Sequence, residues 1–165
     1  MVKLLVDIVS KNGNLLLSVP LRADGTLDDK EEVILNDLGE WMSVNKECII
    51  DTRPWKVFGE GPIAESAIPL NAQGFNEGAY NKATAKEIRF TQNGQKLYAT
   101  VLAWPEERQV LIKSLADGNS LYPGKIKKVE LLGYGKVSFT RTPNGLLVNL
   151  PDKQVNKIAP VFKIN

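Results

Sequence analysis

The spacing of apolar positions divides this chain into two parts with different periods. Near the start, Leu4, Leu5, Ile8 and Val9 recur at the spacing of an amphipathic helix. From Glu87 onward, apolar and polar residues alternate instead, which is typical of strands. The pattern therefore predicts a mainly β protein with a helical N-terminal segment.

The second part reads as a series of short strands with no helical pattern between them. Asn93-Gly94 is a hairpin turn signal, as is the later Asn144-Gly145. Between residues 95 and 104, one set of alternating side chains should face each side of a sheet. We therefore expect an antiparallel β-sandwich over residues 87–165. The other strands are expected at residues 110–113, 126–132, 137–141, 146–150 and 161–164.

Residues 1–52 read as helix, strand and helix. Gly13 is expected to end the first helix in a left-handed conformation. The apolar run 15–19 is expected to form a strand that is covered on both faces. Thr26 and Asp29 have the spacing of a capping box for a second helix over residues 26–44. This segment alone cannot bury its own apolar faces.

The second helix carries an apolar stripe made of Ile34, Leu38, Trp41 and Met42. Apolar surface left in water costs about 25 cal/mol per Å². Large exposed apolar patches usually mark a contact with a partner. We therefore expect this stripe to pack onto the sandwich or against a second copy of the chain.

Residues 53–86 have no regular period and are expected to form a linker between the two parts. Prolines and glycines interrupt the segment repeatedly. The polar stretch 71–82 is expected either to be a mobile loop or to be held down by Phe75 and Tyr80.

Composition narrows the function classes. The chain has 21 basic and 19 acidic residues, a net charge of +2 and no visible basic stripe, so we expect no nucleic-acid partner. Its apolar runs are too short to span a membrane. It contains no histidine, which removes Ser-His-Asp and Cys-His catalysis and disfavours a zinc site, and we expect no cofactor. The single cysteine, Cys48, is expected to be a buried thiol.

Aromatic residues raise the question of sugar binding. Trp55 follows Pro54 at the expected joint, and Trp104 ends a strand before Pro105. Both are candidates for stacking on a sugar ring. Packing between layers or domains explains these positions more economically.

An ordered series of short motifs resembles the α-L-fucosidases, family 29 of the glycoside hydrolases. The series begins with residues 5–17 (LVDIVSKNGNLLL) and continues through residues 22–26 (RADGT), 39–41 (GEW) and 52–55 (TRPW). It goes on with residues 59–62 (GEGP), 87–91 (EIRFT) and 102–105 (LAWP). One departure lies at residues 18–21, where SVPL stands in place of the family's usual Asn-Ile-Gly-Pro.

The resemblance implies a retaining glycosidase that uses two carboxylates on a (β/α)₈-like barrel followed by a β-sandwich. It places both carboxylates upstream of Met1, so no catalytic residue is expected here. Residues 1–52 would be the last β/α unit of that barrel. Loops after barrel strands face the active site, so Ser18, Arg22 and Asp24 are candidates for the substrate rim. A loop ion pair or turn cap is the simpler reading of Arg22 and Asp24.

Two hypotheses follow from this resemblance. In the first, the chain is a non-catalytic accessory part of an α-L-fucosidase. The partner of the chain is then the missing barrel or a second copy of the chain, and only the parent enzyme binds fucosylated glycan. In the second, it is a free-standing carbohydrate-binding sandwich. Exposure of two or more of Trp55, Tyr98 and Trp104 in one plane on a flat face would favour binding, whereas burial of all three would favour the accessory role. The resemblance implies an extracytoplasmic parent enzyme.

Overall fold

The computed structural model describes residues 1–66 and 82–165. Helices α1 (Val2–Ser10) and α2 (Asp29–Asn45) come first, and strands make up most of the remainder. Short 3-10 turns follow α2 at Lys46–Cys48 and β4 at Lys113–Leu115. The strands are β1 (Arg53–Glu60), β2 (Ile88–Asn93), β3 (Lys96–Val101), β4 (Gln109–Ile112), β5 (Val129–Leu131), β6 (Gly135–Lys136), β7 (Phe139–Thr142), β8 (Gly145–Asn149) and β9 (Val161–Ile164).

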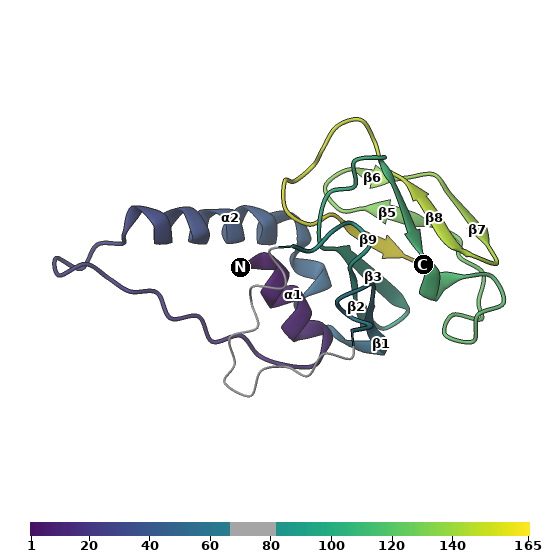
Figure 1. Ribbon diagram of the computed structural model, residues 1–165, viewed down its shortest axis with the longest axis horizontal. Coiled ribbons are helices and arrows are strands. Elements are labelled where there is room, and N and C mark those ends of the chain that lie inside the picture. The colour runs from purple at the N-terminus through teal and green to yellow at the C-terminus, as the bar shows by residue number, and fades with distance from the viewer. Residues whose placement is uncertain (67–81) are drawn as a thin grey trace.

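The strands form two antiparallel sheets (Figure 1). One has the order β1-β2-β3-β9-β5-β6, and the other has the order β4-β8-β7. The expected hairpin at Asn93-Gly94 joins β2 to β3, with Asn93 opposite Lys96. The predicted antiparallel β-sandwich is therefore confirmed.

The six-stranded sheet is buried on both faces. One face packs against the three-stranded sheet, and this core includes Phe90 and Leu97 from the first sheet with Ile112 and Leu146 from the second. The opposite face packs against the helices, in a second core that includes Trp41. A sheet covered on both sides needs apolar or fully paired residues at every position, which explains why nearly all of β3 is buried.

The predicted alternation in β3 is confirmed. Leu97, Ala99 and Val101 belong to the core between the sheets. Tyr98 and Leu102 belong to the core beneath the helices.

Helix α2 is attached to the sheet at one end only. Trp41 is 2% exposed, and its indole Nε1 donates a hydrogen bond to the Ala159 carbonyl oxygen at 2.8 Å, just before β9. Leu38 and Met42 are half-buried against the same core, whereas Ile34 is exposed. The expected packing of the stripe on the sandwich is thus met at the C-terminal half of α2. In Figure 1 the other half projects away from the sandwich.

Residues 11–28, which we call the arm, connect α1 to α2 and run out to the tip of this projection (Figure 1). The strand expected at residues 15–19 is not formed, because no neighbouring strand supplies hydrogen bonds to it in the described part of the chain. The arm contains one isolated bridge, between Leu21 and Leu27.

Two local predictions at the ends of the helices are wrong. The left-handed residue after α1 is Asn12, with φ 65°, whereas Gly13 lies so close to Ile8 that a Cβ would be 2.9 Å from its Cγ2. At α2 the N-cap is Asp28, whose carboxylate accepts a hydrogen bond from the backbone N–H of Lys30. The Thr26 hydroxyl is already used within the loop.

The segment expected as a linker contains β1, an edge strand that the sequence pattern did not predict. The pairing of β1 with β2 shifts register between Pro54 and Gly59, and this irregularity disrupts the period of two. Residues 67–81, including most of the stretch expected to be a polar loop with Phe75 and Tyr80, lie outside the described residues.

Candidate functional site

The three rim candidates lie on the arm. Ser18 is exposed on the extended stretch, and Arg22 and Asp24 lie together in the turn at its tip. The Arg22 guanidinium lies 3.0 Å from the Asp29 carboxylate and 3.5 Å from that of Asp28. These contacts tie the turn to the first residues of α2.

Asp24 closes the same turn from the inside. Its Oδ1 accepts hydrogen bonds from the Thr26 N–H at 3.0 Å and from the Thr26 hydroxyl at 2.7 Å. The backbone hydrogen bond from Thr26, followed by the one from its hydroxyl, lowers the pKa of Asp24. Arg22 and Asp24 therefore act as the ion pair and turn cap that the simpler reading of the sequence proposed.

The two tryptophan candidates belong to the core between the sheets. Trp55 on β1 is buried and packs edge-to-face on Phe90, with ring centroids 5.0 Å apart. Trp104 is half-buried against the same core. Tyr98 lies on the opposite face of the sheet, where its hydroxyl donates to the Glu47 carboxylate at 3.1 Å. The three rings do not share a flat exposed face.

Trp55 borders a groove of about 460 Å³. The β2–β3 hairpin contributes Gln92 and Lys96 to its wall, and the loop between β4 and β5 contributes Tyr122 and two further lysines. This volume lies within the range of about 300–1,000 Å³ that is usual for ligand sites. The sequence analysis missed this groove because its walls come from segments that are far apart in the chain.

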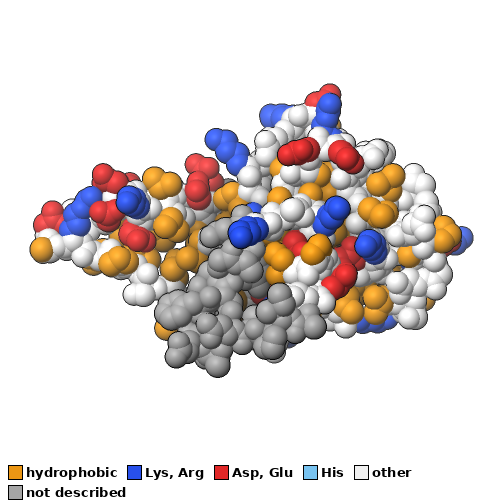
Figure 2. Space-filling view, viewed as in Figure 1, with side chains coloured by type: hydrophobic (Ala, Val, Ile, Leu, Met, Phe, Trp, Pro, Cys, Tyr) orange, Lys and Arg blue, Asp and Glu red, His pale blue; other side chains and the backbone are white. Residues whose placement is uncertain are grey.

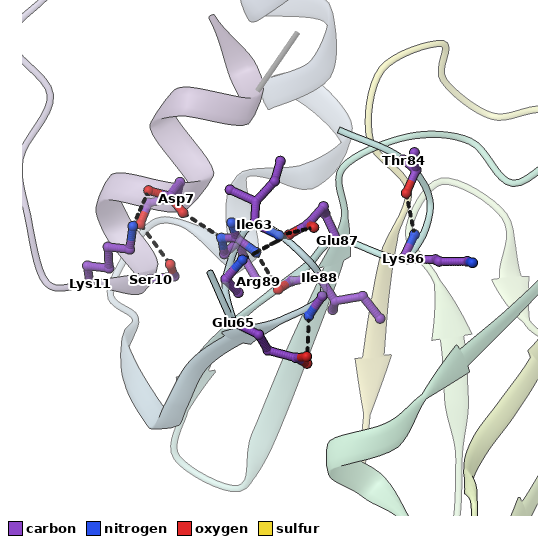
Figure 3. Close-up of polar contacts among 12 residues, drawn as sticks. Asp7, Ser10, Lys11, Ile63, Glu65, Thr84, Lys86, Glu87, Ile88 and Arg89 are labelled. Carbon is purple, nitrogen blue, oxygen red and sulfur yellow. Dashed lines mark hydrogen bonds and ion pairs between the residues drawn. The ribbon is translucent and has the colours of Figure 1, made fainter. Parts of the chain in front are cut away.

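A buried ionic cluster joins α1 to the six-stranded sheet (Figure 3). The Arg89 Nε on β2 donates to the Asp7 carboxylate on α1, which also pairs with Lys11 at 2.7 Å. The second Arg89 nitrogen, Nη1, lies 3.3 Å from the Glu87 carboxylate. In turn, Glu87 accepts a hydrogen bond from the backbone N–H of Ile63 at 2.5 Å.

The alternation from Glu87 onward counts Arg89 among the polar positions of a strand and gives it no role. The signal that could have revealed the cluster was a charged residue in a strand whose neighbours on both sides are apolar. Gly59 makes room for this side chain, because a Cβ there would lie 2.9 Å from the Arg89 Cδ.

The buried carboxylates of the described residues all hold other parts of the protein. Asp7 and Glu87 contact Arg89, as described above. Glu60 accepts backbone N–H hydrogen bonds from Lys113 at 2.8 Å and from Ser114 at 2.7 Å. In the described part of the chain, no group of three or more potential metal-binding side chains comes together. The arrangement serves to fix backbone and helices rather than to expose paired acids.

A second polar group holds the end of α2 against the sheet. The Glu47 carboxylate lies 2.8 Å from the Lys163 ammonium on β9. Burial opposes ionisation of Glu47, but the hydrogen bonds from Lys163 and Tyr98 outweigh this effect, and the pKa of Glu47 is lowered. Burial, followed by the hydrogen bond to Glu47, raises the pKa of Tyr98.

Cys48 lies next to this group and is buried, as predicted. Burial raises the pKa of its thiol to about 12. A thiol in this state is a poor nucleophile, since the thiolate is the reactive form. Within the described residues, no helix has the length and apolar character needed to cross a bilayer.

The fold and its contacts define a two-sheet sandwich domain with two helices packed on its larger sheet. Two family models match the chain: alpha-L-fucosidase over residues 1–47, and the alpha-L-fucosidase C-terminal domain over residues 80–165. Since the second match covers more than half of the sequence, the chain belongs to the α-L-fucosidase family and contains its C-terminal domain.

Similar proteins agree with this assignment. The plasma alpha-L-fucosidase of Rattus norvegicus is 27% identical over 162 residues, which is 96% of this chain and 29% of that protein. The tissue alpha-L-fucosidase of Mus musculus is 30% identical over 149 residues, 89% of this chain and 27% of that protein. The chain therefore spans about three-tenths of the length of these relatives.

Solved structures show the same arrangement. A crystal structure of Thermotoga maritima alpha-fucosidase matches with a TM-score of 0.72 and 26% identity, covering 99% of this chain and 33% of that one. Alpha-L-fucosidase isoenzyme 1 from Paenibacillus thiaminolyticus matches with a TM-score of 0.65 and 25% identity, also over 99% of this chain and 33% of that one. The likeness includes the helices as well as the sandwich.

Proposed function

We propose that this chain serves as the non-catalytic C-terminal accessory part of an α-L-fucosidase. In this proposal, α2 and the arm dock on the catalytic part of the enzyme, which hydrolyses terminal α-L-fucose, and the sandwich stabilises that part. The observation that carries the proposal is the concentration of exposed apolar side chains on α2 and the arm.

Among the described residues, six of the nine exposed large apolar side chains belong to residues 1–45. Leu16 on the arm is 95% exposed and Val33 on α2 is 59% exposed. Figure 2 shows apolar side chains along the projecting part of the molecule. Because monomeric proteins rarely leave such a series in water, it supports a surface that is covered in the working protein. The six are Met1, Leu16, Leu21, Val33, Ile34 and Val44.

The comparisons favour a catalytic part as the occupant of this surface. Residues 1–47, which carry the exposed series, match the alpha-L-fucosidase model rather than the model of the C-terminal domain. The relatives are more than three times as long as the matched segment. Side chains that belong to the catalytic module in sequence are suited to pack against the rest of that module.

The buried carboxylates support a non-catalytic role for the chain itself. A retaining glycosidase needs two carboxyl groups that flank the scissile bond. Asp7, Glu60 and Glu87 are instead occupied by Arg89 and by backbone N–H groups. The exposed Arg22 and Asp24 are engaged within their own turn. If the arm reaches the substrate rim of the assembled enzyme, Ser18 is the rim candidate whose side chain would contact the substrate, because Arg22 and Asp24 are engaged in their turn.

The burial of Trp55 and Tyr98 and the half-burial of Trp104 support the accessory role over a flat sugar-binding platform on these three rings. The relatives named plasma alpha-L-fucosidase support an extracytoplasmic setting for the enzyme.

Sedimentation equilibrium and hydrogen exchange of the 165-residue chain test the docking. We expect a monomer at low concentration whose arm amides exchange quickly, with weak and open-ended association as concentration rises. The double variant Leu16→Asp/Val33→Asp should suppress this association, whereas Leu111→Asp, at an exposed leucine on β4, should leave it unchanged.

A stable dimer with a protected arm would mean that a second copy covers the surface. That result would contradict docking on a catalytic part, and so would association that Leu16→Asp/Val33→Asp leaves unchanged.

A further inference from the structure

We propose that the groove beside Trp55 binds an acidic carbohydrate, a sugar chain that carries carboxylate or sulfate groups. The groove lies between the β2–β3 hairpin and the loop that precedes β5. This site is separate from the docking surface on α2 and the arm, and its ligand is separate from the terminal fucose of the proposed reaction.

The charge of the groove carries the first part of the argument. Lys96, Lys125 and Lys127 line it, and its wall includes no aspartate or glutamate. All three lysines are exposed and, within the described part of the chain, form no ion pair. Lys96 interacts electrostatically with Glu47 on the helix-facing side of the sheet, so the free positive charge of the groove rests on Lys125 and Lys127. Lys125 and Lys127 outnumber the single α-carboxylate of Asn165 that also lines the groove, and this balance of charge favours an anionic ligand.

Aromatic and amide groups make the second part of the argument. The half-buried Tyr122 and the amide-bearing Gln92 line the groove, and the buried Trp55 borders it. Rings provide apolar contact for the C–H face of a sugar at low entropic cost, and amides exchange hydrogen bonds with hydroxyl groups. A site for a simple anion would need neither, so the combination favours a charged sugar over phosphate, and the hexaglutamate probe below separates a sugar from an acidic peptide.

The loop between β4 and β5 is held in place without a ligand. The Arg141 guanidinium on β7 donates hydrogen bonds to the carbonyl oxygens of Leu115, Ala116, Tyr122 and Gly124, at 2.6–3.0 Å. It also lies 5.6 Å from the centre of the Tyr122 ring.

On the far side of the loop, the Lys127 N–H donates to the Asn165 carbonyl oxygen at 2.7 Å. Lys56 on β1 donates to the Ser120 carbonyl oxygen at 3.3 Å. A loop fixed at several points loses little conformational entropy when a ligand binds, which increases affinity.

Isothermal titration calorimetry of the 165-residue chain tests the proposal with four probes. These are a hyaluronan tetrasaccharide, which is carboxylated; a chondroitin 4-sulfate tetrasaccharide, which is also sulfated; chitotetraose, which is neutral; and hexaglutamate, which is acidic without sugar. We expect at least one acidic tetrasaccharide to bind at least tenfold more tightly than either chitotetraose or hexaglutamate. The better of the two acidic sugars identifies the preferred anionic group.

Variants locate the site. Lys125→Ala/Lys127→Ala should weaken binding of the acidic tetrasaccharide at least tenfold. The control Lys153→Ala/Lys157→Ala removes the same charge at exposed positions outside the groove and should change affinity less than twofold. Tyr122→Leu should weaken binding about fivefold if the ring contacts the sugar.

Several outcomes would overturn the proposal. Absence of binding by both acidic tetrasaccharides at millimolar concentration would show that the proposed site does not exist. Equal losses of affinity in the two lysine double variants would show that binding reflects general electrostatic attraction to the protein and not the groove. Hexaglutamate binding as tightly as the sugars, or full affinity in Tyr122→Leu, would mean that the groove recognises charge alone.

Discussion

Arg89 on β2 and Asp7 on α1 form an ion pair across 82 positions of sequence, with side chains only 0% and 5% exposed. This pair holds α1 against the six-stranded sheet. Removing one partner of a buried pair is costly because it leaves the other charge in the protein interior. The Arg89 Nη2 lacks a hydrogen-bond partner among the described residues. No further acceptor is therefore at hand to replace Asp7 if its charge is removed.

Asp7→Asn should therefore lower the free energy of unfolding by about 3 kcal/mol. Urea denaturation followed by far-UV circular dichroism measures this change. Asp24→Asn removes the same charge from the exposed turn of the arm and should leave the unfolding midpoint nearly unchanged. Equal midpoints for the wild type and Asp7→Asn would show that the ion pair does not hold α1 in place.

Glycine substitutions at Gly59 and Gly39 should have opposite signs. At Gly59 a Cβ would lie 2.5 Å from the Ile88 carbonyl oxygen, so Gly59→Ala should destabilise the protein by about 1–3 kcal/mol. At Gly39, within α2, a Cβ would meet no atom within 4 Å, so Gly39→Ala should stabilise the helix by up to about 1 kcal/mol. Thermal unfolding of both variants checks the pair of predictions. A stable Gly59→Ala protein would mean that β1 does not approach β2 as described.

Cys48 should resist thiol reagents in the native state. Its pKa is raised to about 12 by burial, so at pH 8 the thiol is protonated as well as inaccessible. A disulfide reagent such as DTNB should react slowly with native protein and rapidly in 6 M guanidinium chloride. Rapid stoichiometric labelling of the native protein would contradict the packing of residues 45–48 against the sheet.

The same burial predicts a loss of stability in alkali. The folded-state pKa of Cys48 is raised above the ordinary value of 9.0, so the stabilisation is complete below pH 9 and is lost as pH rises toward 12. The pKa of Tyr98 is raised in the same direction. Each group contributes a slope of at most about 1.4 kcal/mol per pH unit. Urea denaturation between pH 8 and 10.5 should show this decline in the free energy of unfolding, and Cys48→Ala should make the decline shallower. An equally steep decline in the variant would show that groups other than Cys48 cause it.

The sandwich could be predicted from sequence because its signals are local. Alternation in β3 and the Asn93-Gly94 turn depend on residues close together in the chain, and the structure follows both. Strand β1 was not predicted because its pairing breaks register between Pro54 and Gly59, which hides the period of two. Its place at the sheet edge depends on a partner more than 25 positions away.

The N-terminal segment shows a different limit of sequence reasoning. The run at residues 15–19 has the composition of a buried strand, but composition does not supply the neighbours that a strand needs. In α1, the apolar positions Leu4 and Ile8 are only half-buried, while Asp7 is buried because Arg89 lies opposite it. Pairing across 82 positions leaves no mark in a local pattern.

The candidate sites follow the same division. The turn formed by Arg22 and Asp24 was foreseen because its partners lie within seven residues. The groove at Trp55 was not, since it needs β1, the β2–β3 hairpin and the loop held by Arg141 to come together.

The most direct test of the accessory role is release of p-nitrophenol from p-nitrophenyl α-L-fucoside by the purified 165-residue chain, beside a mock preparation. The account predicts no release above the mock, because the buried carboxylates are committed to Arg89 and to the backbone. Turnover that follows the protein through purification, and that falls when a carboxylate of this chain is replaced by its amide, would show that the chain is itself a catalyst and would contradict the account.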